Sequence, residues 1–279
     1  MELKDKTIIT VAPTGTLSPK AVNPSVPITP EEIAEDVYRC YKAGASVAHL
    51  HMRDDNDRGT MDKERFKETV DRIRDKCDII INCTTSGEPG ASYEKRMEHL
   101  AYVKPDMATF DAGTFNWIPL NTFDNSLEFL MRLGKEMKAN NIKPEFEIFY
   151  EGMFDDVLYC YKQGVIEPPF HFQFVLGVNG ADQATVANLD RLVKEMKARM
   201  PEGSTWSAFG ISKQNIPILQ TALALDGNIR VGLEDTGYFS KGVHADNLSL
   251  VERAVKFVEL NNKKPATVAE ARAILSLDK

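Results

Sequence analysis

The chain has 279 residues, of which 43% are hydrophobic and 27% charged, and its formal net charge is −7 at neutral pH. This composition is typical of a globular domain, and the acidic balance argues against nonspecific binding to nucleic acid or an anionic membrane, so we expect neither as a partner. No run of 18 apolar residues is present, and the first six residues lack the basic and then apolar pattern of a secretion signal, so we expect neither a transmembrane helix nor a leader.

The four cysteines, Cys40, Cys77, Cys83 and Cys160, include no C-x-x-C pair. Three of them fall in apolar stretches with the period of a helix or a strand, where a buried thiol packs as a small apolar group. We therefore expect four free thiols and a reducing, cytoplasmic location.

Runs of β-branched and apolar residues alternate with amphipathic stretches of helical period, which predicts alternating strands and helices. The predicted strands are 7–12, 47–51, 79–84, 105–111, 143–149, 170–176, 204–209 and 228–234. The predicted helices are 30–43, 62–76, 93–103, 126–139, one through 157–161 that ends near 164, 186–200, 215–225, one through 248–258, and a short one at 267–275. The first helix has a clear start, because Thr29 can cap it and Glu32 can complete a capping box. The connection 13–28 is long for a compact domain, which makes it a candidate functional loop.

Eight strand–helix units follow one another without a linker-like break, which predicts a parallel sheet. Eight such units at this length favour an α/β protein with a closed (β/α)8 TIM barrel, a fold that typically takes about 250 residues. We expect one barrel domain over residues 1–279, with a short C-terminal helical extension at about 264–279. An open, doubly wound sheet is the alternative.

The predicted strand Val47–His51 ends in two histidines one residue apart. Because alternate side chains of a strand point the same way, His49 and His51 share a face. Two neighbouring imidazoles without an acidic partner in their strand are costly to bury unless a ligand uses their lone pairs. Zinc is the usual occupant of a His-x-His site that gains a carboxylate from elsewhere.

The C-terminal ends of the predicted strands are unusually polar, and in a barrel these ends carry the active site. The polar residues are His49, His51, Asn82, Thr84, Thr109, Asp111, Glu145, Glu147, His171, Gln173, Arg230, Glu234 and Asp235. The phenylalanines that alternate with them in the fifth and sixth strands are expected to pack outward against helices, which leaves the polar set in the barrel mouth. Pairing of these side chains inside the barrel for packing alone is the alternative.

Glu234, at the end of the predicted eighth strand, is a candidate third ligand for a metal bound by His49 and His51. Two histidines and one carboxylate leave coordination positions open, as in catalytic zinc sites. Arg230 and Asp235 lie beside Glu234 in the sequence, and an arginine next to a carboxylate can hold it oriented and ionised for proton abstraction.

At these segments the chain resembles the β-keto acid cleavage enzyme family, nearly end to end. The resemblance lies in Val26–Ile33, Ala43–Ser46 with His49–His51, Lys104–Thr109, Pro144–Glu147, Phe172–Val178 and Ile229–Asp235. The family fold is a (β/α)8 barrel, which agrees with the independent prediction.

The resemblance also implies roles for individual residues. The implied roles are zinc ligands for His49, His51 and Glu234, catalytic roles for Asp235, Arg230 and Glu147, and substrate binding for Thr84, Thr109, Thr85 and Ser86. The family commonly has a serine in place of Thr84, and the hydroxyl is retained. A homotetramer is implied as well.

The implied reaction converts a 3-keto acid and acetyl-CoA into acetoacetate and a new acyl-CoA by retro-Claisen cleavage. Zinc is expected to polarise the ketone, and Asp235, held by Arg230, to take a proton from the acetyl-CoA methyl group. The substrate is expected to be 3-keto-5-aminohexanoate or a related 3-keto acid. One departure bears on this choice: a family glutamate fitted to the substrate ammonium is replaced by Leu17, which favours an uncharged or differently substituted keto acid.

Two alternatives remain open. A metal-dependent barrel hydrolase of the amidohydrolase type also uses His-x-His, but there the pair normally ends the first strand. A metal-free barrel that binds a partner is the other.

We also state expectations for residues outside the predicted active site. Arg53 is expected to pair with Asp54 within its loop, and His99 to lie at the surface or the core edge without a functional role. Trp117 is left open between a site wall and a subunit contact.

Overall fold

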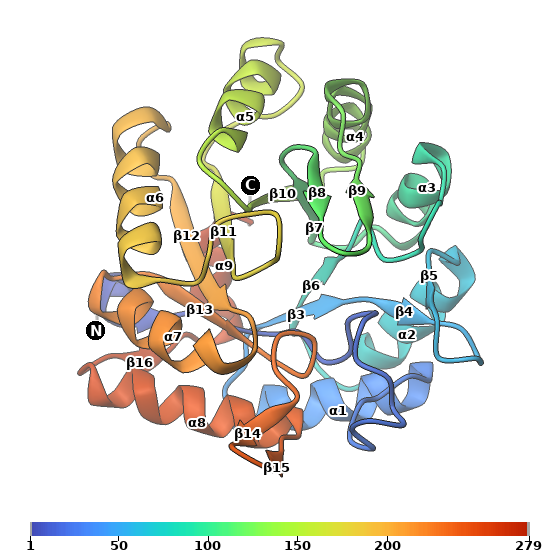
Figure 1. Ribbon diagram of the computed structural model, residues 1–279, viewed down its shortest axis with the longest axis vertical. Coiled ribbons are helices and arrows are strands. Elements are labelled where there is room, and N and C mark those ends of the chain that lie inside the picture. Colours follow the sequence, from blue (N-terminus) through green and yellow to red (C-terminus); the bar gives the residue numbers. More distant parts are fainter. Residues whose placement is uncertain (1, 278–279) are drawn as a thin grey trace.

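A computed structural model describes residues 2–277, in which eight parallel strands close into a barrel (Figure 1). The barrel strands are β2 (Ile9–Val11), β3 (Val47–Leu50), β6 (Ile80–Cys83), β7 (Met107–Asp111), β10 (Lys143–Ile148), β11 (His171–Leu176), β12 (Thr205–Gly210) and β13 (Asn228–Val231). Neighbours in the barrel follow chain order, and pairing of β13 with β2 closes the ring. The predicted TIM barrel is therefore confirmed, and the open sheet is excluded.

Helices surround the barrel and alternate with its strands along the chain (Figure 1). They are α1 (Pro30–Ala43), α2 (Lys63–Arg74), α3 (Tyr93–Val103), α4 (Leu127–Ala139), α5 (Met153–Lys162), α6 (Val186–Arg199), α7 (Asn215–Ala224) and α8 (Asn247–Leu260). A further helix, α9 (Val268–Leu275), follows α8 near the end of the chain. The capping box predicted at the start of α1 is present: Thr29 accepts a bond from the Glu32 backbone N–H, and the Glu32 side chain accepts one from Thr29. No helix within residues 2–277 is long and apolar enough to cross a membrane.

Short β-hairpins lie in the loops that follow some of the barrel strands. Three antiparallel hairpins follow barrel strands: β4 (Met52–Arg53) with β5 (Gly59–Thr60), β8 (Phe115–Trp117) with β9 (Asn121–Phe123), and β14 (Tyr238–Ser240) with β15 (Val243–His244). The sequence pattern does not predict these hairpins, because each strand has only two or three residues and carries no clear alternation.

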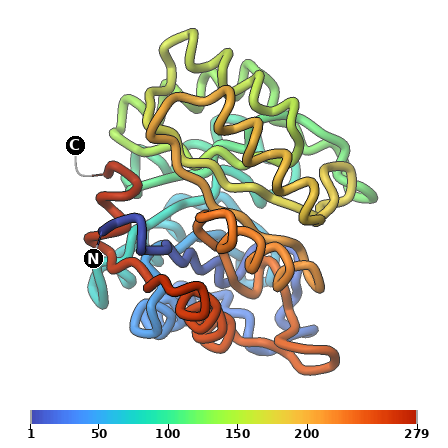
Figure 2. Tube along the Cα trace, turned by 90° about the vertical axis from the view of Figure 1, so that its left-hand side faces the viewer, coloured from blue at the N-terminus to red at the C-terminus, as the bar shows by residue number. Residues whose placement is uncertain are grey.

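The two ends of the chain lie on the same side of the molecule (Figure 2). After the short turn η1 (Leu3–Asp5), β1 (Lys6–Thr7) pairs in parallel with β16 (Lys264–Pro265). Residues of α9 pack on side chains from the starts of the barrel strands, among them Ile8, Val47 and Met107. The C-terminal extension therefore covers the end of the barrel opposite to the polar strand ends.

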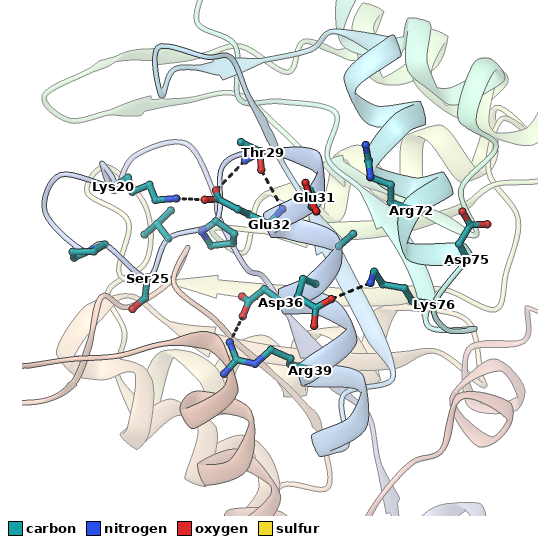
Figure 3. A pocket seen from close by; sticks show the side chains of 15 residues that line it. Lys20, Ser25, Thr29, Glu31, Glu32, Asp36, Arg39, Arg72, Asp75 and Lys76 are labelled. Atoms are coloured by element: carbon teal, nitrogen blue, oxygen red, sulfur yellow. Dashed lines mark hydrogen bonds and ion pairs between the residues drawn. The ribbon is translucent and has the colours of Figure 1, made fainter.

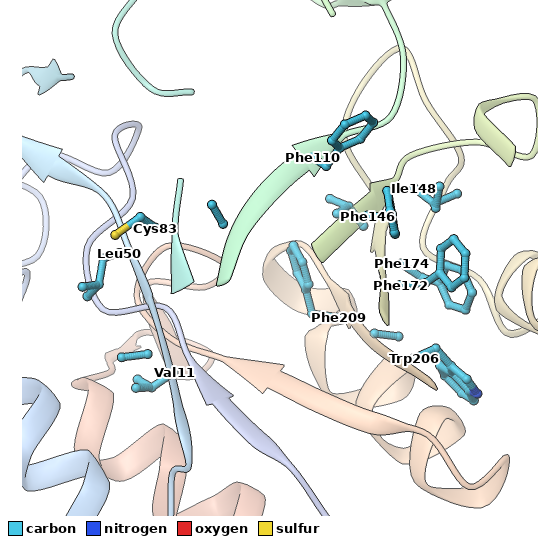
Figure 4. Packing of buried hydrophobic residues seen from close by; sticks show 14 of the residues in the cluster. Val11, Leu50, Cys83, Phe110, Phe146, Ile148, Phe172, Phe174, Trp206 and Phe209 are labelled. Carbon is cyan, nitrogen blue, oxygen red and sulfur yellow. The ribbon is translucent and has the colours of Figure 1, made fainter. Parts of the chain in front are cut away.

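Phe146 of β10 and Phe172 and Phe174 of β11 lie together in the hydrophobic core, on the face of the strands opposite to Glu145 and Glu147, as predicted (Figure 4). Phe146 lies 5.2 Å from Phe110 and 5.5 Å from Phe172 between ring centroids, and Phe172 lies 5.6 Å from Phe154 of α5. Each fully buried phenylalanine contributes roughly 2–3 kcal/mol of hydrophobic free energy. This packing sets the phase of the strands, so that Glu145 and Glu147 point into the barrel.

Candidate active site

A cavity of about 710 Å³ opens where the barrel strands end. Its base is formed by His51, Glu147, Arg230, Glu234 and Asp235, which come from three different parts of the chain. The cavity thus lies at the C-terminal face of the barrel, where the polar residues were predicted to gather.

His49 is a residue of β3, and His51 follows directly after that strand ends at Leu50. Both side chains point the same way, as predicted, with their ring centroids 5.0 Å apart. His49 is almost fully buried at 1% exposure, whereas His51 forms part of the cavity surface.

Glu234 reaches the histidines because the chain leaves β13 earlier than predicted. The strand ends at Val231 rather than at Glu234, because Gly232 has a φ of +153° and packs so closely on Ala12 that a Cβ would lie 2.0 Å from its carbonyl oxygen. The chain then turns, and the Glu234 backbone N–H donates to the same carbonyl. As a result, Glu234 Oε1 lies 3.5 Å from Nε2 of both His49 and His51.

These three side chains fit a divalent metal such as zinc. Both ring nitrogens of His49, Nδ1 of His51 and Oε2 of Glu234 are buried without a hydrogen-bond partner among the described residues. Buried polar atoms normally have hydrogen-bond partners, so a cluster of buried atoms without partners indicates that a ligand binds there. Burial, with Arg230 nearby, lowers the pKa of His49 to about 4, so its lone pair is free at neutral pH. Burial alone would raise the pKa of Glu234, but Arg230 and the two histidines hold it well below its usual range.

A second set of donors, His49, Glu145 and Glu147, also brings its atoms within 4.8 Å of one another. Here burial raises the pKa of Glu145 to about 7 and that of Glu147 well above its usual range, with the Asp111 charge adding to the latter. Carboxyl groups that keep their protons are poor ligands. We therefore favour the set with Glu234.

Arg230 is a buried cation that contacts several carboxyl groups of the site. It is 2% exposed, and its guanidinium lies 4.2 Å from the Phe209 ring centroid. It donates to both carboxylate oxygens of Asp235, at 2.8 and 3.1 Å, to Glu147 at 3.3 Å, and to Glu234 Oε1. One guanidinium thus organises three carboxyl groups around the base of the cavity.

The chain matches the model described as beta-keto acid cleavage enzyme over residues 6–277. It belongs to the β-keto acid cleavage enzyme family. A 3-keto-5-aminohexanoate cleavage enzyme of Fusobacterium nucleatum is 40% identical, with 99% of this chain and 100% of the relative covered. A 3-oxoadipate:acetyl-CoA acetyltransferase of Cupriavidus necator is 35% identical, with 97% and 94% covered. ObcA, in a ternary complex with a C4-CoA adduct and oxalate, shares the fold at 22% identity, with a TM-score of 0.82 over 91% of this chain and 68% of that chain.

In this member of the β-keto acid cleavage enzyme family, the four hydroxyl residues named from the sequence divide into two pairs. Thr84 and Ser86 line the cavity, and the Thr84 hydroxyl accepts a bond from the Ser86 backbone N–H. Thr85 and Thr109 are buried outside the cavity lining. The Thr85 backbone N–H donates to the Thr109 hydroxyl, and the Thr85 hydroxyl donates to the Thr109 carbonyl. Thr85 and Thr109 therefore anchor the loop that presents Thr84 and Ser86.

The expectations for Arg53 and His99 were wrong. Arg53 pairs with Asp57 at 2.7 Å rather than with Asp54, and it also donates to the carbonyls of Thr14 and Gly15. His99 is fully buried and stacks on Phe66 at 4.3 Å between ring centroids, instead of lying at the surface or the core edge. Trp117, whose place was left open, lines the cavity, so the β8–β9 hairpin is a wall of the site.

A second hollow, of about 780 Å³, lies beside α1 and α2 (Figure 3). Six of its charged side chains form ion pairs within the hollow: Lys20 with Glu32 at 2.5 Å, Lys76 with Glu35 at 3.0 Å, and Arg39 with Asp36 at 3.7 Å. The pairs of Lys20 and Lys76 are ordinary surface ion pairs, whereas Asp36 is a buried residue at the edge of the hollow. We assign this hollow no function.

Proposed function

We propose that this chain catalyses the acetyl-CoA-dependent cleavage of a 3-keto acid to acetoacetate and a new acyl-CoA. Family membership supports this, as does the use of acetyl-CoA in the name of the Cupriavidus necator relative. The observation that carries the proposal is the junction of His49, His51 and Glu234 with the Arg230–Asp235 pair at the base of one cavity.

Atom balance defines the step that needs a base. The substrate R–CO–CH₂–COO⁻ and acetyl-CoA give R–CO–SCoA and CH₃–CO–CH₂–COO⁻. A bond therefore forms between C2 of the keto acid and the acetyl carbonyl carbon, the bond between C2 and C3 breaks, and the CoA thiolate passes from the acetyl carbon to C3. The proton that must leave first is on C2 of the keto acid. This corrects the expectation from the sequence, which placed it on the acetyl-CoA methyl group.

Asp235 is the proposed base for that proton. It lies at the cavity base, and the Arg230 fork fixes the orientation of its carboxylate. Burial raises the pKa of Asp235 to about 6, although Arg230 opposes this, so the group is ionised at neutral pH and more basic than an ordinary aspartate. A base whose pKa lies near the working pH is efficient in proton transfer.

His49, His51 and Glu234 are the proposed zinc ligands. A zinc ion held there would supply Lewis-acid polarisation of the keto group, which makes the C2 proton more acidic. Glu147, held by Arg230 at 3.3 Å, and the hydroxyls of Thr84 and Ser86 face the same cavity and are proposed to orient the reacting oxygens.

A direct test incubates the purified protein with acetyl-CoA and a 3-keto acid labelled with ¹³C at C2, and follows the products by mass spectrometry. We expect labelled acetoacetate together with the acyl-CoA of the R group. Label in the acyl-CoA, or no acetoacetate across a panel of keto acids, would contradict the proposal.

Two variants separate the proposed roles in this test. Glu234→Gln should lose both zinc, measured by elemental analysis, and activity. Asp235→Asn should keep zinc but lose activity and exchange of the C2 proton with deuterated water. Glu88→Gln serves as a matched control, because Glu88 lines the cavity wall but bonds the Met61 backbone N–H at 2.6 Å.

We further propose that the enzyme works in the cytoplasm as a homotetramer. The four cysteines, all within the described residues, are free thiols, which supports a reducing compartment. Light scattering coupled to gel filtration tests the tetramer, and a dimer or monomer at micromolar concentration would contradict it.

A further inference from the structure

The cavity wall above the charged base is built mostly from apolar side chains. They include Leu17, Trp117, Pro119, Leu120, Phe149 and Val178. Leu17 and Leu120 are 59% and 53% exposed, unusually open for leucines. Large, exposed apolar side chains that line a cavity indicate a site that binds an apolar group of a ligand.

Three charged residues of the wall, Asp124, Glu88 and Arg96, form hydrogen bonds within the protein. Asp124 accepts a bond from the Tyr93 hydroxyl at 2.7 Å, and Glu88 accepts one from the Met61 backbone N–H. Arg96 donates to the Thr85 and Asp124 carbonyls, both at 2.7 Å, and to the Asn125 side chain at 2.6 Å. Asp111 also lines the cavity, with Oδ2 3.8 Å from Arg96 and without a hydrogen-bond partner among the described residues. The charges that remain for a ligand are therefore those of Asp111 and of the cavity base, not those of the wall around Leu17.

Leu17 is held close to that base. Its loop neighbour Gly15 packs against Glu234 so tightly that a Cβ would lie 2.5 Å from the Glu234 side chain. Arg53 fixes the same turn through the carbonyls of Thr14 and Gly15, at 2.7 and 2.9 Å. Leu17 is thus two residues away from Gly15, which contacts the proposed zinc ligand Glu234. Its side chain lines the cavity at a place where it would contact the part of the substrate that extends beyond the reacting carbons.

We propose that the keto acid of this enzyme carries an uncharged, apolar group beyond its keto carbon, which packs on Leu17 and the β8–β9 hairpin. This inference rests on the proposed function and defines its substrate class. The two relatives are named for substrates with a charged end, an ammonium in one and a second carboxylate in the other. A charge packed against Leu17, Trp117 and Leu120 would lose part of its water and would find no charged partner among those three side chains.

Three keto acids test the proposal with little change in shape: 5-methyl-3-oxohexanoate, 5-amino-3-oxohexanoate and 3-oxoadipate. The first two differ by a methyl group in place of an ammonium. We expect kcat/KM with acetyl-CoA to be roughly 100-fold higher for the methyl compound than for either charged one. Equal or higher kcat/KM for a charged compound would overturn this inference while leaving the cleavage activity established. No turnover of any of the three, nor of 3-oxohexanoate, would overturn both.

Substitutions that place a charge at position 17 give a second test of the proposal. Leu17→Glu should raise kcat/KM for 5-amino-3-oxohexanoate about tenfold and lower it for the methyl compound, whereas Leu17→Gln should not favour the ammonium. Val22→Glu is the matched control, since Val22 is 58% exposed in the same loop but lies outside the cavity lining. An unchanged preference in Leu17→Glu, with circular dichroism like the wild type, would overturn the role of Leu17.

Discussion

Arg230 donates two hydrogen bonds to the Asp235 carboxylate, from Nη2 to Oδ1 at 2.8 Å and from Nε to Oδ2 at 3.1 Å. Both side chains are buried, and Asp235 sits in the turn that follows β13, where the backbone alone would leave its side chain free to rotate. The two hydrogen bonds from the guanidinium therefore fix the orientation of the Asp235 carboxylate.

Arg230→Lys should separate charge from geometry. Lysine keeps the positive charge but cannot form the two-pronged contact, so we expect kcat to fall about 100-fold, as for a small displacement of a catalytic group. Steady-state kinetics on the zinc-loaded protein measure this. Arg39→Lys, at an ion pair 3.7 Å long outside the site, should leave kcat unchanged. A kcat within threefold of the wild type in Arg230→Lys would show that the fork is not needed.

Two glycines of one loop allow a matched test of the metal site. Gly87 and Gly90 both have positive φ, +118° and +77°, but a Cβ on Gly87 would lie 2.7 Å from His51 Nδ1, whereas one on Gly90 meets no atom within 4 Å. Alanine at either position should cost about 1–3 kcal/mol in unfolding free energy through backbone strain. Only Gly87→Ala should also displace His51, and we expect its zinc affinity to fall at least roughly tenfold below that of Gly90→Ala. Chelator competition measures both affinities, and equal values would mean that His51 is not a ligand or is not held by this contact.

Arg53 should be as important for stability as a core residue. Its removal would leave Asp57 and two carbonyls of the loop 13–28 without their buried donor. We expect Arg53→Met to lower the free energy of unfolding by about 3–5 kcal/mol, measured by urea denaturation. Arg72→Met is the control: Arg72 pairs with Glu68 on the surface of α2 and should change stability by less than about 1 kcal/mol. A small effect at Arg53 would mean that water can replace its bonds to the loop.

Asp36 should make stability depend on pH. Burial raises the pKa of Asp36 to about 6, although the bond from Asn247 opposes this. The unfolded chain loses this proton near pH 4, whereas the folded chain keeps it until about pH 6. The stabilising contribution is therefore fully present below about pH 4 and is lost as the pH rises through 6.

Asp36→Asn cannot ionise and can still accept the bond from Asn247. We expect its unfolding free energy to equal that of the wild type near pH 4 and to exceed it by up to about 3 kcal/mol above pH 7, since two pKa units correspond to roughly that amount. Urea denaturation at a series of pH values gives this difference. A difference that does not change with pH would contradict the raised pKa.

The barrel, and the gathering of polar residues at the C-terminal ends of its strands, could be predicted from the residue pattern alone. Period-two runs that alternate with amphipathic helices leave few topologies, and the phenylalanines opposite Glu145 and Glu147 set the phase of the strands. The shared face of His49 and His51 followed from their spacing in one strand, which is a local property of the backbone.

The contacts between residues far apart in the chain could not be predicted from the pattern, because they arise only when the barrel closes. Glu234 approaches His49 because β13, β2 and β3 are neighbours in the closed ring, and because contact with Ala12 ends β13 at Val231. Arg53 chooses Asp57 and two carbonyls over its neighbour Asp54, and the β8–β9 hairpin brings Trp117 to the cavity. Such choices depend on close approach of backbones and on competition among hydrogen-bond partners far apart in the chain, and a sequence pattern carries no record of either.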